Sequence, residues 1–306
     1  MPHLVGMSLE ADLLLDRRRI KRRLMFWRVC AVLALAGLAW AFLPEDLDPV
    51  PAAHVARLEL RGAITEDRKQ LEALERVARD ANVRALIVAI DSPGGTVAGG
   101  EALHAAIRRV AQHKPVVATM GATAASAGYM VALPAHRIFA REGTLTGSIG
   151  VILQSFDASE LLARLGVRPE TVASGSLKDQ PSPFRPLTAE GRASLEQTVQ
   201  DMHSQFVGMV AAGRNMEEPA VRAIADGRVM TGRRAQEAGL VDTLGGEREA
   251  REWLEAERQV PQSLPVRTIE TRPLAERLLA TGTEGMLRIL QAEWWGQQGL
   301  RAALAR

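Results

Sequence analysis

The hydrophobic positions between residues 55 and 120 alternate between two spacings. Residues 55–60, 83–90 and 115–120 form short runs rich in apolar side chains, which are typical of buried strands. Between these runs, residues 67–78 and 99–112 place their apolar side chains three or four positions apart, which predicts helices. Because strands and helices alternate in this way, we expect an α/β fold built on a parallel sheet with right-handed crossovers.

The chain up to residue 270 continues with shorter predicted elements. The pattern predicts strands at 137–140, 144–154, 169–172 and 266–270. It predicts helices at 157–165, 188–213, 219–226 and 246–257, and Thr188 is the expected cap of the longest one. Prolines at positions 181, 183 and 186 indicate an extended loop ahead of that long helix.

A mostly apolar run precedes all of these elements. Residues 24–43 are long enough to cross a bilayer core as a helix, and basic residues cluster at 17–23, directly before it. This charge bias predicts a single-pass anchor in the cell inner membrane, with a cytoplasmic N-terminus and a periplasmic or extracellular remainder. A cleaved secretory signal is the alternative, because Ala39-Trp40-Ala41 fits the pattern of a cleavage site.

These patterns divide the chain into four parts. We expect a basic cytoplasmic tail at residues 1–23, a transmembrane helix at 24–43, a folded domain at 50–260 and a C-terminal extension at 261–306. The extension contains an amphipathic helix, which is expected to pack either on a partner subunit or on the bilayer.

Charge and cysteine content exclude several classes of function. The formal net charge is +2, but residues 1–28 hold seven Lys or Arg and three acids, so the remainder carries +2 − 4 = −2. A domain with that charge is not expected to bind nucleic acid. Cys30 is the only cysteine, and the six histidines lack metal-ligand spacing, so we expect neither a disulfide nor a metal site.

The stretch GATAASAGY at 121–129 carries the first candidate for chemistry. Ser126 lies where the strand at 115–120 gives way to a predicted short helix, among small residues that let a substrate approach closely. The free N–H groups of a helix N-terminus stabilise developing negative charge, which suits an acyl-transfer nucleophile. The alternative is a site where small residues let a helix pack on the sheet.

A serine nucleophile needs a base, and none of the histidines lies in a motif typical of one. Lys178 is the candidate base, since it follows a predicted strand and a turn of small residues. Burial favours the neutral form of a lysine and lowers its pKa, which is what a base requires. The alternative is an ordinary solvated lysine in a loop.

A third candidate is the segment DSPGG at 91–95, which follows the strand at 83–90. Its proline and two glycines form a turn from which backbone N–H groups can point into a site. The N–H of Gly95, paired with that of Ala127, would then form an oxyanion hole. The alternative is a simple strand-to-helix turn.

Taken together, six segments in order resemble the signal peptide peptidase A family of membrane-bound serine proteases, peptidase family S49. They are DSPGGTV at 91–97, GATAASAGYMVA at 121–132, TGSIGVI at 146–152, SGSLKD at 174–179, PFRPLT at 183–188 and GRVMTGRRAQEAGLVDTLGG at 227–246. The resemblance implies a ClpP/crotonase-like parallel sheet with helices on both faces, and a Ser–Lys dyad that needs no cofactor.

The same resemblance implies roles for particular residues. Ser126 would be the nucleophile and Lys178 the general base, which makes residues 50–260 a protease domain. Gly95 and Ala127 would supply the oxyanion N–H groups, and Ser148 would orient the lysine. Short members of the family assemble into rings, so we expect a homo-oligomer, with an octamer as one form, whose serine and lysine can come from neighbouring protomers.

The expected function is therefore that of a membrane-anchored serine endopeptidase. Its substrates would be hydrophobic peptides, such as signal peptides that remain in the membrane after secretion. Two alternatives stay open, namely a crotonase-type acyl-CoA enzyme and a non-catalytic membrane scaffold.

Overall fold

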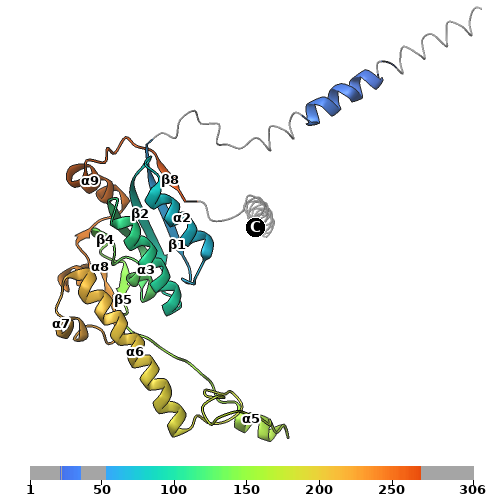
Figure 1. Ribbon diagram of the computed structural model, residues 1–306, viewed down its shortest axis with the longest axis vertical. Helices are drawn as coiled ribbons and strands as arrows, with labels where there is room; N and C mark the ends of the chain where they lie inside the picture. Colours follow the sequence, from blue (N-terminus) through green and yellow to red (C-terminus); the bar gives the residue numbers. More distant parts are fainter. Residues whose placement is uncertain (1–20, 22, 36–52, 270–306) are drawn as a thin grey trace, which may run out of the picture. The chain divides into compact units, whose positions relative to one another are not determined.

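The computed structural model describes residues 21, 23–35 and 53–269 (Figure 1). The chain divides into two compact units, residues 1–51 and 52–306, and each is considered by itself. In the first unit, residues 23–35 are helical, whereas residues 36–43 of the predicted anchor lie outside the described residues. Within the described ranges, no helix is both long and apolar enough to span a membrane. The extension beyond residue 269 also lies outside them.

The second unit is built on one mixed sheet. Its strands within residues 53–269 are β1 (His54–Arg61), β2 (Val83–Ser92), β3 (Val116–Ala125), β4 (Arg137–Ala140), β5 (Leu145–Gly147), β6 (Val229–Thr231), β7 (Thr243–Leu244) and β8 (Val266–Thr268). They are ordered β6-β5-β3-β2-β1-β8, and β4 pairs with both β3 and β7. The β5–β6 pair is antiparallel, and the other pairs of this sheet are parallel. The predicted parallel α/β sheet is confirmed.

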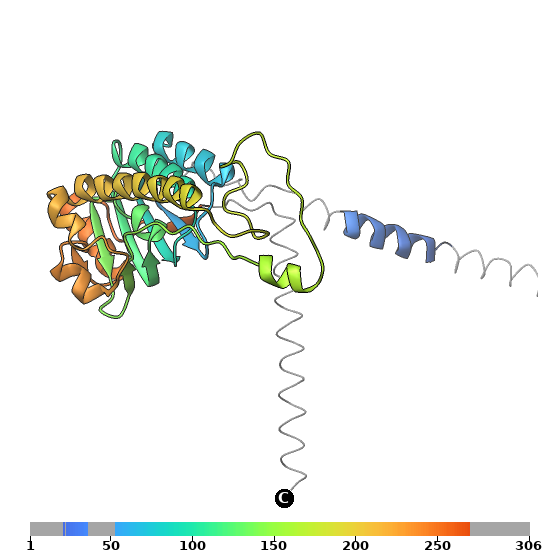
Figure 2. The ribbon, with the colours of Figure 1, turned by 90° about the horizontal axis from the view of Figure 1, so that it is seen from below.

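Helices cover both faces of this sheet. The helices of residues 53–269 are α2 (Arg68–Arg79), α3 (Val97–Ala111), α4 (Ala127–Met130), α5 (Ser159–Arg164), α6 (Ala189–Arg214), α7 (Glu218–Arg222), α8 (Gly232–Glu237) and α9 (Glu247–Arg258). Figures 1 and 2 show α2, α3 and α6 along one face. The opposite face is covered by α9, whose Ala250 and Leu254 pack on Val55, Ile87 and Phe139.

The alternation within β2 explains why both faces are buried. Leu86, Val88 and Ile90 belong to the core under α2, α3 and α6, whereas Ala85 and Ile87 belong to the core under α9. Successive side chains of a strand point to opposite faces, so a strand buried on both sides needs apolar residues at nearly every position. The continuous apolar run of residues 85–90 meets that requirement.

Side-chain caps begin three of the helices where the sequence changes from extended to helical spacing. Asp67 accepts a hydrogen bond from the Lys69 N–H at the start of α2, and Thr96 accepts one from the Gly99 N–H at the start of α3. Thr188 caps α6 in the same way, as predicted. Each cap supplies an acceptor for an N–H group that the helix itself cannot satisfy.

Strand β3 changes partner along its length. Residues 117–120 pair with β4, and residues 123–125 pair with β5. The strand therefore continues through GATAA, five residues beyond the run that the hydrophobic pattern predicted. Thr144, which is buried just before β5, donates a hydrogen bond to the Gly121 carbonyl oxygen at the point of exchange.

One predicted strand is shorter than expected, and another is absent from the described residues. Only residues 145–147 of the segment 144–154 form a strand, and residues 169–172 form none. Both departures fall in the segment 151–187, which carries α5 and lies away from the sheet in Figures 1 and 2. Apolar spacing favours a strand, but the strand forms only where a neighbouring strand is available for pairing.

A buried hydroxyl gives a test of this core. Tyr129 is fully buried in α4, and its hydroxyl donates to the Leu240 carbonyl oxygen at 2.9 Å. Because Tyr129→Phe leaves that carbonyl without its partner, we expect the free energy of unfolding to fall by about 1–2 kcal/mol. Denaturant titration of the protein in detergent micelles measures this value.

The matched control removes a similar hydroxyl from the surface. Thr198 also donates to a backbone carbonyl oxygen, that of Ser194, but in an exposed part of α6. Thr198→Ala should change the free energy of unfolding by less than about 0.5 kcal/mol. Equal losses in the two variants would contradict the role assigned to the Tyr129 hydroxyl.

Candidate active site

Ser126 lies at the turn between β3 and α4, as the sequence predicted. Its backbone has φ +54° and ψ −121°, a conformation that non-glycine residues rarely adopt. The Ser126 N–H donates to the Gly147 carbonyl oxygen of β5 at 2.9 Å, which holds the turn in place. Such backbone strain, of order 1–3 kcal/mol, persists where the surrounding structure enforces it, and it is common at active sites.

The DSPGG turn packs directly behind this serine. Gly94 has φ +124°, and a Cβ atom added there would lie 2.9 Å from Ser126 Cβ and 3.2 Å from the Ala125 carbonyl oxygen. Buried Ser92, which the sequence analysis did not single out, fixes the turn. Its hydroxyl accepts a hydrogen bond from the Gly94 N–H at 3.1 Å and lies 3.2 Å from the Gly94 carbonyl oxygen.

A single bridge to Ile64 orients the next glycine. The Ile64 N–H donates to the Gly94 carbonyl oxygen, and the Thr96 N–H donates to the Ile64 carbonyl oxygen. A Cβ atom at Gly95 would lie 1.8 Å from that Ile64 oxygen, so no larger residue fits. Within the described residues, no hydrogen bond uses the N–H of Gly95 or of Ala127. Both predicted oxyanion donors are therefore available.

One cavity of about 490 Å³ brings three of the predicted residues together. Ser126, Gly95 and Ser148 all line it. Ser148 has φ +49°, and its N–H donates to the Arg228 carbonyl oxygen at 2.9 Å. Ala127 directly follows Ser126 as the first residue of α4.

The cavity wall also contains residues that the sequence analysis missed. From α6 come Val199, Gln200 and His203, and from the segment after α7 come Ala225, Asp226 and Gly227. The ring nitrogen Nε2 of His203 lies 2.8 Å from the Ala225 carbonyl oxygen, and because a carbonyl only accepts, Nε2 carries the hydrogen. Apolar helical spacing around His203 gave no sign that this face of α6 lines a cavity.

Asp226 is unsuited to act as the base. Hydrogen bonds from the Arg228 side chain and backbone N–H lower the pKa of its carboxyl group to about 2. At neutral pH the group is therefore a stable carboxylate with little tendency to take up a proton from a serine hydroxyl.

Lys178 does not join Ser126 within this chain. It lies in the turns after α5, its side chain is exposed, and it does not line the cavity. Neither the Ser126 hydroxyl nor the Lys178 ammonium group makes a hydrogen bond to another described residue. One chain thus provides a strained, accessible serine and free N–H donors beside it, while the predicted base stands apart.

Comparison with known proteins agrees with this site. Residues 108–261 match peptidase family S49. The chain belongs to peptidase family S49, the family of signal peptide peptidase A. It is therefore a protease, and the resemblance seen in the six sequence segments is confirmed.

Individual relatives of this S49 chain differ in how much of their length it covers. A "putative protease" of Synechocystis sp. is 39% identical over 77% of this chain and 86% of that protein. The "putative signal peptide peptidase SppA" of Enterococcus faecium is 36% identical over 62% of this chain and 56% of that protein. A solved ClpP1 variant from Listeria monocytogenes is 16% identical, with a TM-score of 0.42 over 63% of this chain and 92% of that chain. That likeness is too weak to bear on the fold, so the ClpP/crotonase-like arrangement stays a prediction.

The contact between Gly94 and Ser126 gives a test of the site. Gly94→Ala places a methyl group 2.9 Å from Ser126 Cβ, which is closer than real Cβ contacts. It also puts a side chain on a residue with positive φ, which strains the backbone. We expect peptidase activity to fall by about 100-fold, the scale of losing one oxyanion donor, because the turn and the serine must separate. Cleavage of a fluorogenic hydrophobic peptide measures this loss.

Gly143→Ala is the matched control for that variant. A Cβ atom at Gly143 meets nothing within 4 Å, and the residue lies in a turn outside the cavity. Its activity should stay within about twofold of the original protein. Full activity in the Gly94→Ala variant would show that the close packing behind Ser126 has no part in catalysis.

Proposed function

We propose that this protein is a serine endopeptidase in which Ser126 attacks the carbonyl carbon of a peptide bond. The observation that carries the proposal is the strained serine beside unused N–H groups in one cavity. As the tetrahedral intermediate forms, its oxyanion would accept hydrogen bonds from the N–H groups of Gly95 and Ala127. The intermediate collapses to an acyl-enzyme, which water then hydrolyses.

In this proposal Lys178 is the general base. The neutral Lys178 amine takes the proton of the Ser126 hydroxyl during attack and gives it to the leaving amine. Ser148, which lines the same cavity and has a hydroxyl directed by an unusual backbone conformation, would orient that amine. A lysine that is exposed in one chain can lose its hydration, and thus its charge, only when another surface covers it.

A second copy of the chain is the partner that we propose for this step. The segment 151–187, which carries Lys178, exposes large apolar side chains to solvent, namely Ile152, Leu153, Phe156, Leu161, Leu165, Val167, Val172, Leu177 and Phe184. Such a set marks a surface that is covered in the working protein. Covering it by a neighbouring protomer would bury Lys178 and complete the site in a homo-oligomer, with an octamer as one form.

The proposed substrates are hydrophobic peptides, such as signal peptides left in the membrane. A groove of about 440 Å³ between α6 and the start of the segment 151–187 is lined by Leu153, Leu187 and Leu195. It shares Ile152, Val199 and Gln200 with the cavity of Ser126, so an extended apolar peptide could occupy both. Apolar side chains beside polar groups such as Arg192 and Glu196 suit a peptide, whose side chains and backbone need both kinds of contact.

We also propose that residues 24–43 anchor the protein in the inner membrane, with residues 53–269 on the far side from the cytoplasm. In the helix at 23–35, the large apolar side chains are exposed, including Leu24, Phe26, Trp27, Leu33 and Leu35. Exposed apolar residues all along a helix favour a lipid environment. The basic cluster at 17–23 sets the orientation.

A mixing experiment tests the dyad and its arrangement. Ser126→Ala and Lys178→Ala proteins should each lose peptidase activity by at least about 1,000-fold. If Ser126 and Lys178 of one site come from neighbouring copies, random equal co-assembly leaves about one interface in four with both residues intact, so about a quarter of the activity returns. Peptide cleavage after detergent-mediated mixing measures the recovery.

Three other outcomes of that experiment have distinct meanings. No recovery in mixed oligomers would place both residues in one chain. Activity retained by Lys178→Ala would assign the base to another residue, for which His203 is the nearest candidate in the cavity. Activity retained by Ser126→Ala would remove the proposed nucleophile and favour a scaffold role.

The single cysteine allows a direct test of the anchor. Cys30 lies within the proposed membrane span, so a membrane-impermeant maleimide should leave it unlabelled in intact membranes and label it after solubilisation in detergent. A control protein with an additional cysteine, Ala63→Cys, should be labelled in opened vesicles without detergent, because Ala63 is exposed. Equal labelling at both positions before solubilisation would contradict the anchor.

A further inference from the structure

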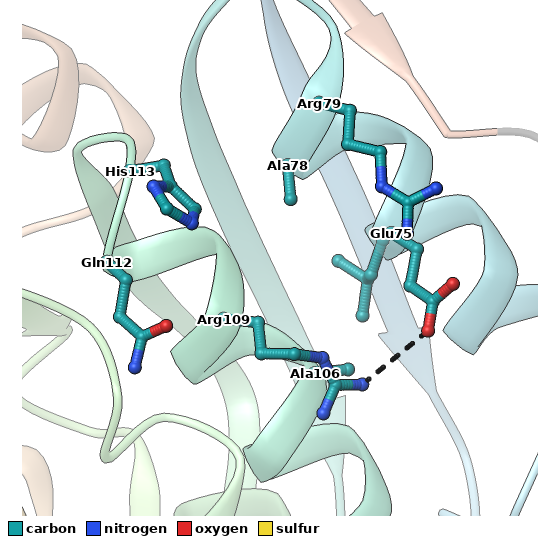
Figure 3. A pocket seen from close by; sticks show the side chains of 8 residues that line it. Glu75, Ala78, Arg79, Ala106, Arg109, Gln112 and His113 are labelled. Carbon is teal, nitrogen blue, oxygen red and sulfur yellow. Dashed lines mark ion pairs between the residues drawn. The ribbon is translucent and has the colours of Figure 1, made fainter.

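A groove between α2 and α3 lies apart from the catalytic cavity. It has a volume of about 390 Å³. Leu74 and Ala106 are buried at its floor and Ala78 is partly exposed, while Arg79, Arg109, Gln112 and His113 provide polar groups around it (Figure 3). Glu75 is the one acid that lines the groove, and it lies 4.0 Å from Arg109. The proposed protease mechanism uses none of these residues.

The groove is the centre of a strongly basic region. Residues 75–84 and 106–114 contain six Lys or Arg and two acids, a balance of +4, whereas the chain from residue 29 onward carries −2. Arg76, Arg79, Arg84 and Arg108 are exposed, and within the described part of the chain none of them takes part in an ion pair. These cations are therefore available to a partner that carries negative charge.

This basic region lies at the end of the domain where the chain enters it. The His54 N–H, at the start of β1, donates to the Asn82 carbonyl oxygen in the turn between α2 and β2. At the end of α3, the Lys114 ammonium group donates to the carbonyl oxygens of Asp80 and Val83 in the same turn. The entry point of β1 and the C-terminal ends of α2 and α3 are thus joined by hydrogen bonds.

Chain length limits how far this end can lie from a membrane. Between residue 43, the last of the proposed anchor, and His54 there are ten residues, which span at most about 35 Å when fully extended. Residues 44–53 include Glu45, Asp46 and Asp48 but no Lys or Arg. They therefore add no basic group that could bind acidic headgroups in place of the groove. The entry end of the domain therefore lies at most about 35 Å from the end of the proposed anchor, within reach of the bilayer surface.

We propose that the groove and its surrounding arginines bind the headgroups of anionic phospholipids. This inference rests on the proposed membrane anchor. Arginine side chains form paired hydrogen bonds with phosphate oxygens, and each basic residue near an anionic membrane strengthens binding by a factor of about five. The buried side chains of Leu74 and Ala106 close the floor of the groove, where the partly exposed Ala78 offers apolar surface to the glycerol of the lipid.

The charge of the region favours lipid over a second copy of the chain. A second protomer would need a matching acidic surface or a broad apolar one, and the large exposed apolar side chains of the domain are concentrated in the segment 151–187 instead. An anionic bilayer surface can neutralise the charge of all four unpaired arginines at once, and it needs no shape complementary to the groove. Its binding would fix the orientation of the domain on the membrane.

Fluorescence quenching in lipid nanodiscs tests this inference on the full chain. Cys30→Ala is combined with Gln112→Cys, which carries a fluorophore at the exposed edge of the groove. The discs contain phosphatidylcholine with a nitroxide on some headgroups, with or without phosphatidylglycerol. We expect phosphatidylglycerol to increase quenching at least about threefold, and high salt to reverse the increase, because salt screens exposed charges.

Two controls separate the groove from the rest of the domain. A label on Ala63→Cys, at the opposite end of β1, should show little quenching in either disc. The variant Arg76→Gln, Arg79→Gln, Arg108→Gln should lose the effect of phosphatidylglycerol. A variant with the same loss of charge elsewhere, Arg164→Gln, Arg222→Gln, Arg234→Gln, should keep it.

The inference would be overturned by equal quenching at the two labels or by quenching that does not respond to phosphatidylglycerol. Full quenching in the Arg76, Arg79 and Arg108 variant would overturn it as well. If the label at Gln112→Cys loses contact with water but is not quenched by lipid, the groove would be assigned to contact with a second protomer. Chains that fail to enter the discs would refute the anchor and this inference together, whereas chains in the discs without quenching would refute this inference alone.

Discussion

The pairing of β3 with β5 is the constraint on which the catalytic cavity depends. If β3 ended with its β4 partner, the chain would turn five residues earlier and Ser126 would have no fixed direction. The added pairing carries the strand to Ala125, and the hydrogen bond from the Ser126 N–H to Gly147 holds the serine in a backbone conformation that it would not adopt alone. The same short strand leads directly into Ser148, so one contact positions both hydroxyl groups.

Close packing against the DSPGG turn completes this arrangement. The bridge to Ile64 uses the Gly94 carbonyl oxygen and the Thr96 N–H, and it leaves the Gly95 N–H between them without a hydrogen-bond partner among the described residues. That N–H group and the strained serine are therefore consequences of ordinary backbone pairing, with no charged side chain involved. In the proposed mechanism, the electrostatic environment that acyl transfer needs comes from backbone dipoles that the folded chain already holds in place.

The sequence allowed the central part of this fold to be predicted because its signals are local. Residues 83–90 and 115–120 are apolar enough to indicate buried strands, and the cap at Thr188 marks the start of the longest helix. The extension of β3 into GATAA could not be predicted, since it depends on a strand more than twenty residues away.

The candidate site could likewise be predicted where its residues lie in local motifs, and not where they depend on distant contacts. Ser126, Gly95 and Ala127 lie in short motifs, and the structure brings them together at the ends of neighbouring strands. Ser92 and His203 were missed, because a buried serine and a helix face toward a cavity leave no mark in hydrophobic spacing. The strands predicted at 144–154 and 169–172 are mostly absent, since those apolar residues have no pairing partner within the described chain.

The long helix α6 has a consequence of its own. In its C-terminal half Phe206, Val207 and Val210 are buried in the core. Its first turns line a groove together with residues at the start of the segment 151–187. At 26 residues it is about 39 Å long, and each inserted or deleted residue would shift one end by 1.5 Å and rotate it by about 100°. A change in the length of α6 would therefore alter both the distance between its buried end and the groove near its other end, and the direction in which that groove faces.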